Sequence, residues 1–96
     1  MSGSKPAPSK PGSMQRRDVI AIVREFLLET KPEETKSLDD DTDLFEIGAL
    51  DSLAIVSMVM FIEERFALSL DYEDLTEENL GSLTAIADTV LRKMAC

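Results

Sequence analysis

The sequence predicts an all-α protein, a small four-helix bundle of three main helices and one short helix, with a long loop between the first and second helices. Apolar residues recur at spacings of three and four in three separate segments, as they do on the buried face of a helix. No segment shows the alternation of a strand over any useful length. The 96 residues suffice for one domain, and 44 % apolar residues are too many for a disordered chain.

The chain before the first helix is expected to stay outside the fold. Residues 1–13 are rich in Ser, Gly, Pro and Lys, the composition of a flexible segment. Gly12-Ser13-Met14 is typical of the junction left by a cloning tag, so we interpret residues 1–13 as a tag or tail. The folded domain is therefore expected over residues 14–96.

The first helix is expected from Gln15 to about Glu29. Pro32 marks its far end, because the residue before a proline avoids helical geometry. Its apolar stripe consists of Val19, Ile22, Val23 and Phe26.

The following loop is acidic from Thr35 to Asp43 and invites comparison with a calcium-binding EF-hand. Asp39, Asp41 and Asp43 match the first, third and fifth positions of such a loop. Leu44 and Leu50 stand where that motif needs Gly and Glu, so a specific calcium site is not expected.

The second helix is expected over Ser52–Phe66 and carries two adjoining apolar stripes. The stripes are Leu53, Val56 and Met60, and then Ile55, Val59, Ile62 and Phe66, with Met58 beside them. One core contact needs a narrower stripe than this. The pattern leaves two interpretations open: the whole helix is buried, or part of the stripe is exposed and awaits a partner.

The C-terminal part contains two more expected helices. A short turn over Glu77–Leu80 follows Thr76, a suitable N-cap, within a segment otherwise interpreted as loop. The last helix is expected from Ser82, its N-cap, to about Lys93, with cations in its last turn. Its apolar face is formed by Leu83, Ile86, Ala87, Val90 and Leu91.

The net charge of −9 is unevenly distributed, because residues 37–80 hold 13 acidic residues and one basic residue, or −12. A field of that sign repels nucleic acid and anionic lipid and attracts basic protein surfaces. No apolar run is long enough to span a bilayer, and the N-terminus lacks an apolar signal core. We therefore expect a cytoplasmic monomer that binds neither nucleic acid nor membrane.

Nucleophilic catalysis by the familiar triads is excluded, because the chain contains no histidine. Cys96 is the only cysteine, so no internal disulfide can form, and the usual zinc ligand sets are missing. Glu63 and Glu64 are adjacent on the second helix, about 100° apart, and do not converge as a catalytic pair. A solvated or partner-facing role suits them better.

Ser52, at the start of the second helix, has two open interpretations. A serine before an apolar run is a good N-cap, because its hydroxyl accepts a bond from a free backbone N–H. The same N–H groups and the helix dipole also favour a phosphate ester on that hydroxyl. With no base in the chain to activate it, another enzyme would have to modify the serine.

The sequence around Ser52 resembles the acyl carrier protein family. Asp51-Ser52-Leu53 matches its D-S-L signature, and Leu44, Phe45 and Gly48 match the preceding L-F-x-x-G turn. The similarity continues through the second helix and through "DLTEENLGSLTAIADTV", and covers about Gln15 to Lys93.

The resemblance implies roles for particular residues. Ser52 would carry 4′-phosphopantetheine, transferred from coenzyme A by a phosphopantetheinyl transferase, and Asp51 would help that transferase and its metal ion to engage. The thiol of the arm would hold the cargo as a thioester. Partner docking would fall to Leu53, Val56, Met60, Glu63 and Glu64. The inward face would be Ile55, Val59, Ile62 and Phe66, against Val19, Val23, Phe26 and the last helix.

Departures from the family pattern bear on the pathway. Ala54 and Ser57 stand where many fatty-acid carriers have acidic residues, and Ala49-Leu50-Asp51 differs from the G-G-x-S-L of peptidyl carriers. The chain is most similar to stand-alone carriers of polyketide and mixed peptide–polyketide biosynthesis. Such a carrier is not an enzyme; its partners would be an acyl-loading enzyme and a ketosynthase, acyltransferase or tailoring enzymes with basic docking surfaces. Two alternatives stay open: an aminoacyl or D-alanyl carrier, and an acidic helical adaptor in which Ser52 is only a helix cap.

Overall fold

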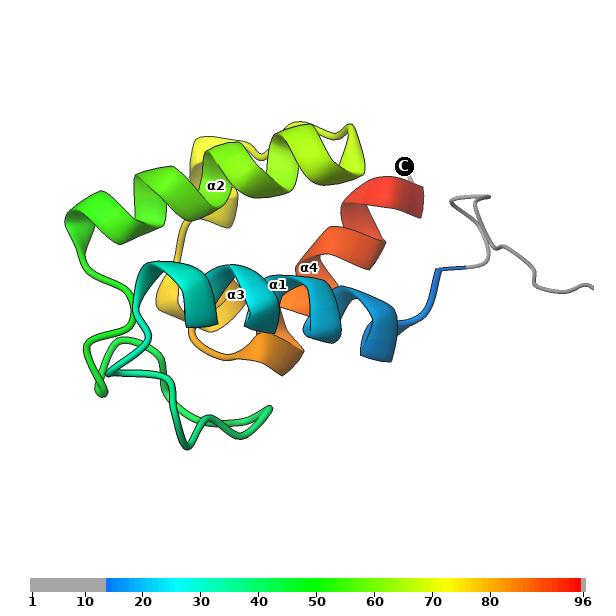
Figure 1. Cartoon of the computed structure of the whole chain (residues 1–96). Helices are drawn as coiled ribbons and strands as arrows, with labels where there is room; N and C mark the ends of the chain where they lie inside the picture. Colours follow the sequence, from blue (N-terminus) through cyan, green and yellow to red (C-terminus); the bar gives the residue numbers. More distant parts are fainter. Residues whose placement is uncertain (1–13, 96) are drawn as a thin grey trace, which may run out of the picture.

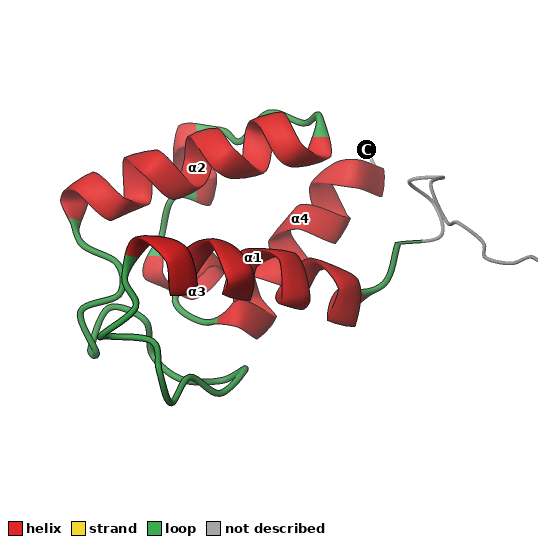
Figure 2. Cartoon of the chain, in the orientation of Figure 1, coloured by secondary structure: helices red, strands yellow, loops and turns green. Residues whose placement is uncertain are grey.

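A computed structural model describes residues 14–95 and confirms the all-α fold (Figures 1 and 2). The described chain contains no strand, and a long loop separates the first two helices. The elements are α1 (Arg16–Thr30), α2 (Ser52–Phe66), the 3₁₀ helix η2 (Tyr72–Asp74), α3 (Glu77–Leu80) and α4 (Leu83–Ala95). The expected flexible segment, residues 1–13, and Cys96 lie outside the described residues. None of the helices between residues 14 and 95 is long and apolar enough to cross a bilayer.

Helix α1 forms one wall of the core, but only Val19 and Val23 of its predicted stripe are buried, and Ile22 and Phe26 are half-buried. It begins after Gln15, whose backbone N–H donates to the Asp18 carboxylate at 2.9 Å. The Phe26 ring is only half-buried, and it stacks on Phe61 of α2 with centroids 4.4 Å apart. The buried residues of the helix are Val19, Ile20, Val23 and Leu27.

Helix α2 has the predicted bounds, but its core face differs by one position. Met58, Ile62 and Phe66 are buried, whereas Ile55 and Val59 are only half-buried. The expectation that Ile55 and Val59 face fully inward was wrong, and Met58, expected beside the two stripes, belongs to the core face. The reason is geometric: the core lies along the row of residues four apart that starts at Met58, and Val59 is rotated about 100° from it.

The loop over residues 31–51 is more than a solvated acidic linker. Leu38, Leu44 and Leu50 are buried in the core. The Leu44 N–H donates to the Gly81 carbonyl at 2.7 Å, which ties the loop to the end of α3. The turn requires glycine at Gly48, whose φ of +82° lies in the left-handed region.

The aspartates of this loop make local and tertiary contacts of their own. Asp43 Oδ1 accepts from the backbone N–H groups of Phe45 and Glu46, at 3.0 and 3.2 Å. Arg24 of α1 pairs with Asp40 and also donates to the Leu38 carbonyl. Within residues 14–95, no cluster of three or more acidic, histidine or cysteine side chains is arranged to hold a metal ion.

The C-terminal helices begin where their caps predict. Thr76 Oγ1 accepts from the Asn79 N–H at 3.2 Å, and Ser82 Oγ accepts from the Ala85 N–H at 3.1 Å. Helix α4 runs two residues beyond the expected end at Lys93.

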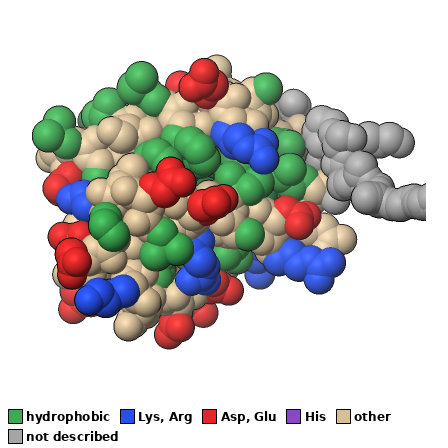
Figure 3. Space-filling model, viewed as in Figure 1, with side chains coloured by type: hydrophobic (Ala, Val, Ile, Leu, Met, Phe, Trp, Pro, Cys, Tyr) green, Lys and Arg blue, Asp and Glu red, His purple; other side chains and the backbone are tan. Residues whose placement is uncertain are grey.

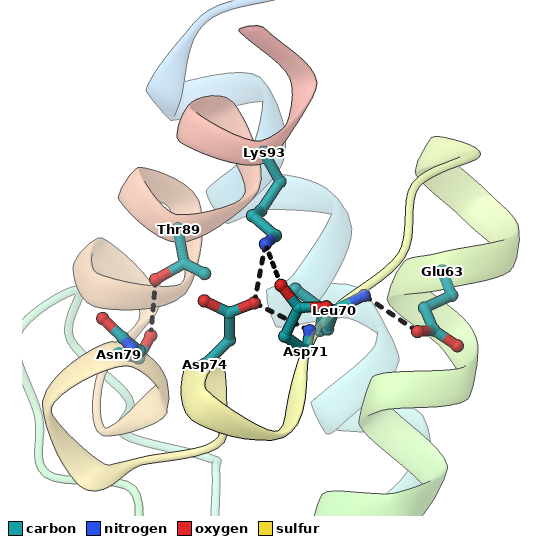
Figure 4. A network of polar contacts seen from close by, with 7 residues as sticks. All are labelled: Glu63, Leu70, Asp71, Asp74, Asn79, Thr89 and Lys93. Atoms are coloured by element: carbon teal, nitrogen blue, oxygen red, sulfur yellow. Dashed lines mark hydrogen bonds and ion pairs between the residues drawn. The ribbon is translucent and has the colours of Figure 1, made fainter. Parts of the chain in front are cut away.

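The 3₁₀ helix η2 is the element that the sequence interpretation missed. Lys93 Nζ lies 3.1 Å from Asp71 Oδ2 and 2.9 Å from Asp74 Oδ2, which fastens η2 to α4 (Figure 4). Hydrogen bonding to Lys93, and then to the Asp71 N–H, lowers the pKa of Asp74, while the two carboxylates raise the pKa of Lys93. Nearby, Thr89 Oγ1 of α4 donates to the Asn79 carbonyl of α3 at 3.1 Å.

Candidate functional site

Ser52 is the first residue of α2, and Asp51 is the N-cap. Asp51 has extended backbone angles (φ −124°, ψ −172°), and its Oδ1 accepts from the Ala54 N–H at 2.8 Å. Of the two open interpretations of Ser52, the one that makes it the helix N-cap is therefore wrong. Both residue types cap well, and the one with extended geometry takes the role. Ser52 is exposed, and its hydroxyl has no hydrogen-bond partner among the described residues.

Asp51 also joins the end of α1 to the start of α2. Its second oxygen, Oδ2, accepts from Lys31 Nζ at 3.1 Å, and Lys31 is the C-cap of α1. The hydrogen bond from Ala54, and then that from Lys31, lowers the pKa of the Asp51 carboxyl. Asp51 therefore carries a negative charge at neutral pH, one residue before Ser52 in the sequence.

The surroundings of Ser52 fit a phosphate ester. The hydroxyl is free of internal bonds and accessible, so an ester on it displaces no contact within the described chain. It stands at the N-terminus of a 15-residue helix, where the dipole and the free N–H groups favour an anion.

The predicted docking residues fall into two groups. Leu53, Val56 and Met60 are exposed by 80, 56 and 63 %, and Glu64 is exposed beside them. We call these four residues the α2 face; hydrophobic side chains crowd the upper edge of the molecule in Figure 3, where α2 lies in Figure 1. The double stripe therefore has one exposed side.

Glu63 is differently placed. Its side chain is half-buried, and Oε2 accepts from the Leu70 N–H at 2.9 Å (Figure 4). Its carboxylate thus has a structural contact in the link that follows α2, which the sequence did not reveal. A docking role for Glu63 stays a prediction.

A pocket of about 290 Å³ lies between the end of α1 and the start of α2. The sequence reasoning missed it, because its two walls lie at least 20 residues apart along the chain. One local signal was present: Ala54 and Ser57, the small residues that depart from the fatty-acid carrier pattern, are both in its wall. The lining residues are Phe26, Leu27, Thr30, Lys31, Asp51, Leu53, Ala54 and Ser57.

Comparison with known proteins agrees with this geometry. The family model described as "Phosphopantetheine attachment site" matches residues 17–90, most of the chain. A search of curated proteins finds no significant match. Domains of the matched family are in general non-catalytic carriers that work with transferases and biosynthetic enzymes. The chain belongs to the family of phosphopantetheine-binding carrier domains, whose prosthetic group is covalently attached 4′-phosphopantetheine.

Proposed function

We propose that this protein is a stand-alone acyl carrier of polyketide-type biosynthesis, with Ser52 as its attachment residue. The observation that carries the proposal is the exposed Ser52 hydroxyl. It makes no capping hydrogen bond, because Asp51 is the N-cap of α2. The D-S-L sequence at residues 51–53 and the family match over residues 17–90 support it.

Attachment depends on an external transferase. The chain has no histidine to act as base toward Ser52, and the adjacent Asp51 carboxylate is held by Ala54 and Lys31. In the transfer, Ser52 Oγ bonds to the phosphorus of the pantetheine phosphate, and adenosine 3′,5′-bisphosphate leaves. The hydroxyl proton passes to a base supplied by the transferase. The terminal thiol of the attached group supplies the thioester linkage to the cargo.

The α2 face is the proposed docking surface for the transferase, the acyl-loading enzyme and the enzymes that act on the cargo. Leu53, Val56 and Met60 offer apolar contact, and Glu64 offers a charge to a basic partner. Docking through one charge and a few apolar side chains is expected to be transient, and screening by salt should weaken its charged part. Transient docking suits a carrier, because the covalent tether itself keeps the cargo at high local concentration beside each partner.

The apolar start of α2 supports the polyketide-type assignment. Ala54 and Ser57 leave the first two turns of the helix without an acidic side chain, whereas many fatty-acid carriers have acids there. The identity of the cargo is the test of this point. A polyketide-type starter or extender unit trapped on the protein from its host supports the assignment, whereas a long fatty acyl chain, an amino acid or D-alanine trapped there overturns it.

The attachment residue is tested by incubation with coenzyme A, magnesium and a broad-specificity phosphopantetheinyl transferase. Intact-mass spectrometry should show one added phosphopantetheine group on the wild type and none on Ser52→Ala. Ser69→Ala, which removes another exposed serine hydroxyl outside the site, is the matched control and should be modified like the wild type. Modification of Ser52→Ala would contradict the assignment of the residue.

A further inference from the structure

The 3₁₀ helix η2 is tied down on two sides although none of its own residues is buried. Within the turn, the Asp71 N–H donates to Asp74 Oδ2 at 2.8 Å. Lys93 of α4 binds both of these aspartates, and Glu63 of α2 accepts from the N–H of Leu70, just before the turn (Figure 4). Polar contacts with α4 and α2 therefore hold a turn that apolar burial does not.

This turn carries an exposed aromatic ring. Tyr72 is 89 % exposed, more than any other large apolar side chain of residues 14–95. Its backbone carbonyl accepts from the Leu75 N–H at 3.1 Å, whereas its hydroxyl has no hydrogen-bond partner among the described residues. Because the ring lies outside the core, it adds little burial energy to the stability of the domain.

An exposed ring on a fixed turn is suited to anchor a protein complex. Tyrosine offers a large contact area with few rotatable bonds, and it is among the residues that dominate binding energy at interfaces. A backbone that is ordered before binding also lowers the entropic cost of the contact. Tyr72 combines both properties, since the contacts of Asp71 and Asp74 hold the backbone on either side of it.

The charges around Tyr72 indicate what kind of surface receives the ring. Residues 71–78 contain five acidic side chains and no basic one, and Asp71 and Glu73, on either side of Tyr72, are exposed. This charge repels nucleic acid and anionic lipid, so the complementary partner is a protein. The surface that fits is an apolar slot for the ring with lysine or arginine at its mouth.

We propose that Tyr72 is the anchor by which the acyl-loading enzyme selects this carrier, with the ring entering an apolar slot that has a basic rim on that enzyme. The inference rests on the proposed function, which requires such an enzyme. A transferase that modifies many carriers reads what they share, which the D-S-L motif at residues 51–53 supplies. A loading enzyme must distinguish one carrier from the others, and a displayed ring outside that motif gives it a separate feature to bind.

The test is a competition for cargo between two holo-proteins in one extract of the native host. Wild type and Tyr72→Ala are first loaded with phosphopantetheine by a broad-specificity transferase and then mixed in equal amounts. Intact-mass spectrometry follows the gain of cargo on each, and the ratio of initial rates gives the ratio of kcat/KM whatever the concentration of the loading enzyme. The wild type should gain cargo at least about fivefold faster, which corresponds to about 1 kcal/mol or more at an interface anchor.

Two control variants separate loss of the ring from other effects. Tyr72→Phe keeps the ring and should compete as well as the wild type, because an apolar slot binds the ring and not the hydroxyl. Leu28→Ala truncates another exposed apolar side chain, 42 % exposed on α1, and should also compete equally. All three variants should melt like the wild type, as substitutions at exposed positions do.

Equal rates for wild type and Tyr72→Ala, an equal loss for Leu28→Ala, or a loss for Tyr72→Phe as large as that for Tyr72→Ala would overturn the proposal. The same competition between apo-proteins, with coenzyme A and the transferase, should give equal rates of phosphopantetheine transfer. A slower Tyr72→Ala in that reaction would assign the ring to the transferase instead. A wild type that accepts no phosphopantetheine, or whose arm gains no cargo in the extract, would refute the proposed function, and so is distinguishable from failure of this inference alone.

Discussion

Met58 and Met60 lie two residues apart on α2 and have opposite environments. Met58 is fully buried, with 0 % of its surface exposed, whereas Met60 is 63 % exposed. Truncation of a buried methionine to alanine removes its apolar transfer energy and leaves a cavity, at a cost of about 2–5 kcal/mol. A domain of about 80 residues has a total stability of about 4–12 kcal/mol. Met58→Ala should therefore lose a large part of the folding free energy.

The assay is urea and thermal unfolding followed by far-ultraviolet circular dichroism. For a domain of this size, Met58→Ala should lower the melting temperature by about 10 °C or more. Met60→Ala is the matched control and should change stability by less than about 0.5 kcal/mol, as surface substitutions do. It should still slow transfer by the transferase, because Met60 belongs to the α2 face.

Equal destabilisation by the two substitutions would refute the two-sided description of α2. A larger loss for Met60→Ala would show that the helix is rotated relative to the core, so that Leu53, Val56 and Met60 are not a free surface.

Three further predictions concern the cap, a glycine and the docking charge. The lowered pKa of Asp51 means that its charge stabilises the fold above the unfolded pKa near 3.8, and that this contribution is lost as pH falls through the lower folded pKa. Asp51→Asn, which keeps a capping oxygen, should therefore show a flatter loss of stability in acid-denaturation curves; curves parallel to the wild type would contradict the shift. Gly81→Ala should destabilise by about 1–3 kcal/mol, because its Cβ would lie 2.4 Å from the Glu77 carbonyl oxygen, and an unchanged thermal melt would count against this packing. Glu64→Lys should lower kcat/KM of the transferase at low salt with an unchanged melt, and salt-independent kinetics would remove Glu64 from the docking surface.

Much of the fold was predictable because helical periodicity and caps are local signals. The bounds of α2 and α3 and the caps at Thr76 and Ser82 follow from residue types within one turn of each helix start. The choice between Asp51 and Ser52 as the N-cap of α2 could not be predicted from residue types. Both side chains suit the position, and only the backbone geometry separates them. Which of Met58 and Val59 enters the core was likewise not predictable, because a rotation of α2 by about 100° about its axis exchanges the two side chains.

Other features that the sequence did not reveal depend on contacts between distant segments. Helix η2 is fastened by Lys93, about 20 residues away along the chain. The pair of Lys31 and Asp51 likewise joins two helix ends across the long loop. The D-S-L motif predicts Ser52 as the attachment residue, but the pocket and the Lys31 cation beside Asp51 appear only when α1 and α2 are brought together.

The most direct test of the account is the mass of the peptide that contains Ser52, taken from protein produced in its own host, where the transferase is present. We predict that this peptide carries phosphopantetheine on Ser52, with fragment ions that place the group on that residue. A Ser52 peptide recovered only in unmodified form, from cells whose other carrier proteins are modified, would contradict the assignment of this chain as a working carrier.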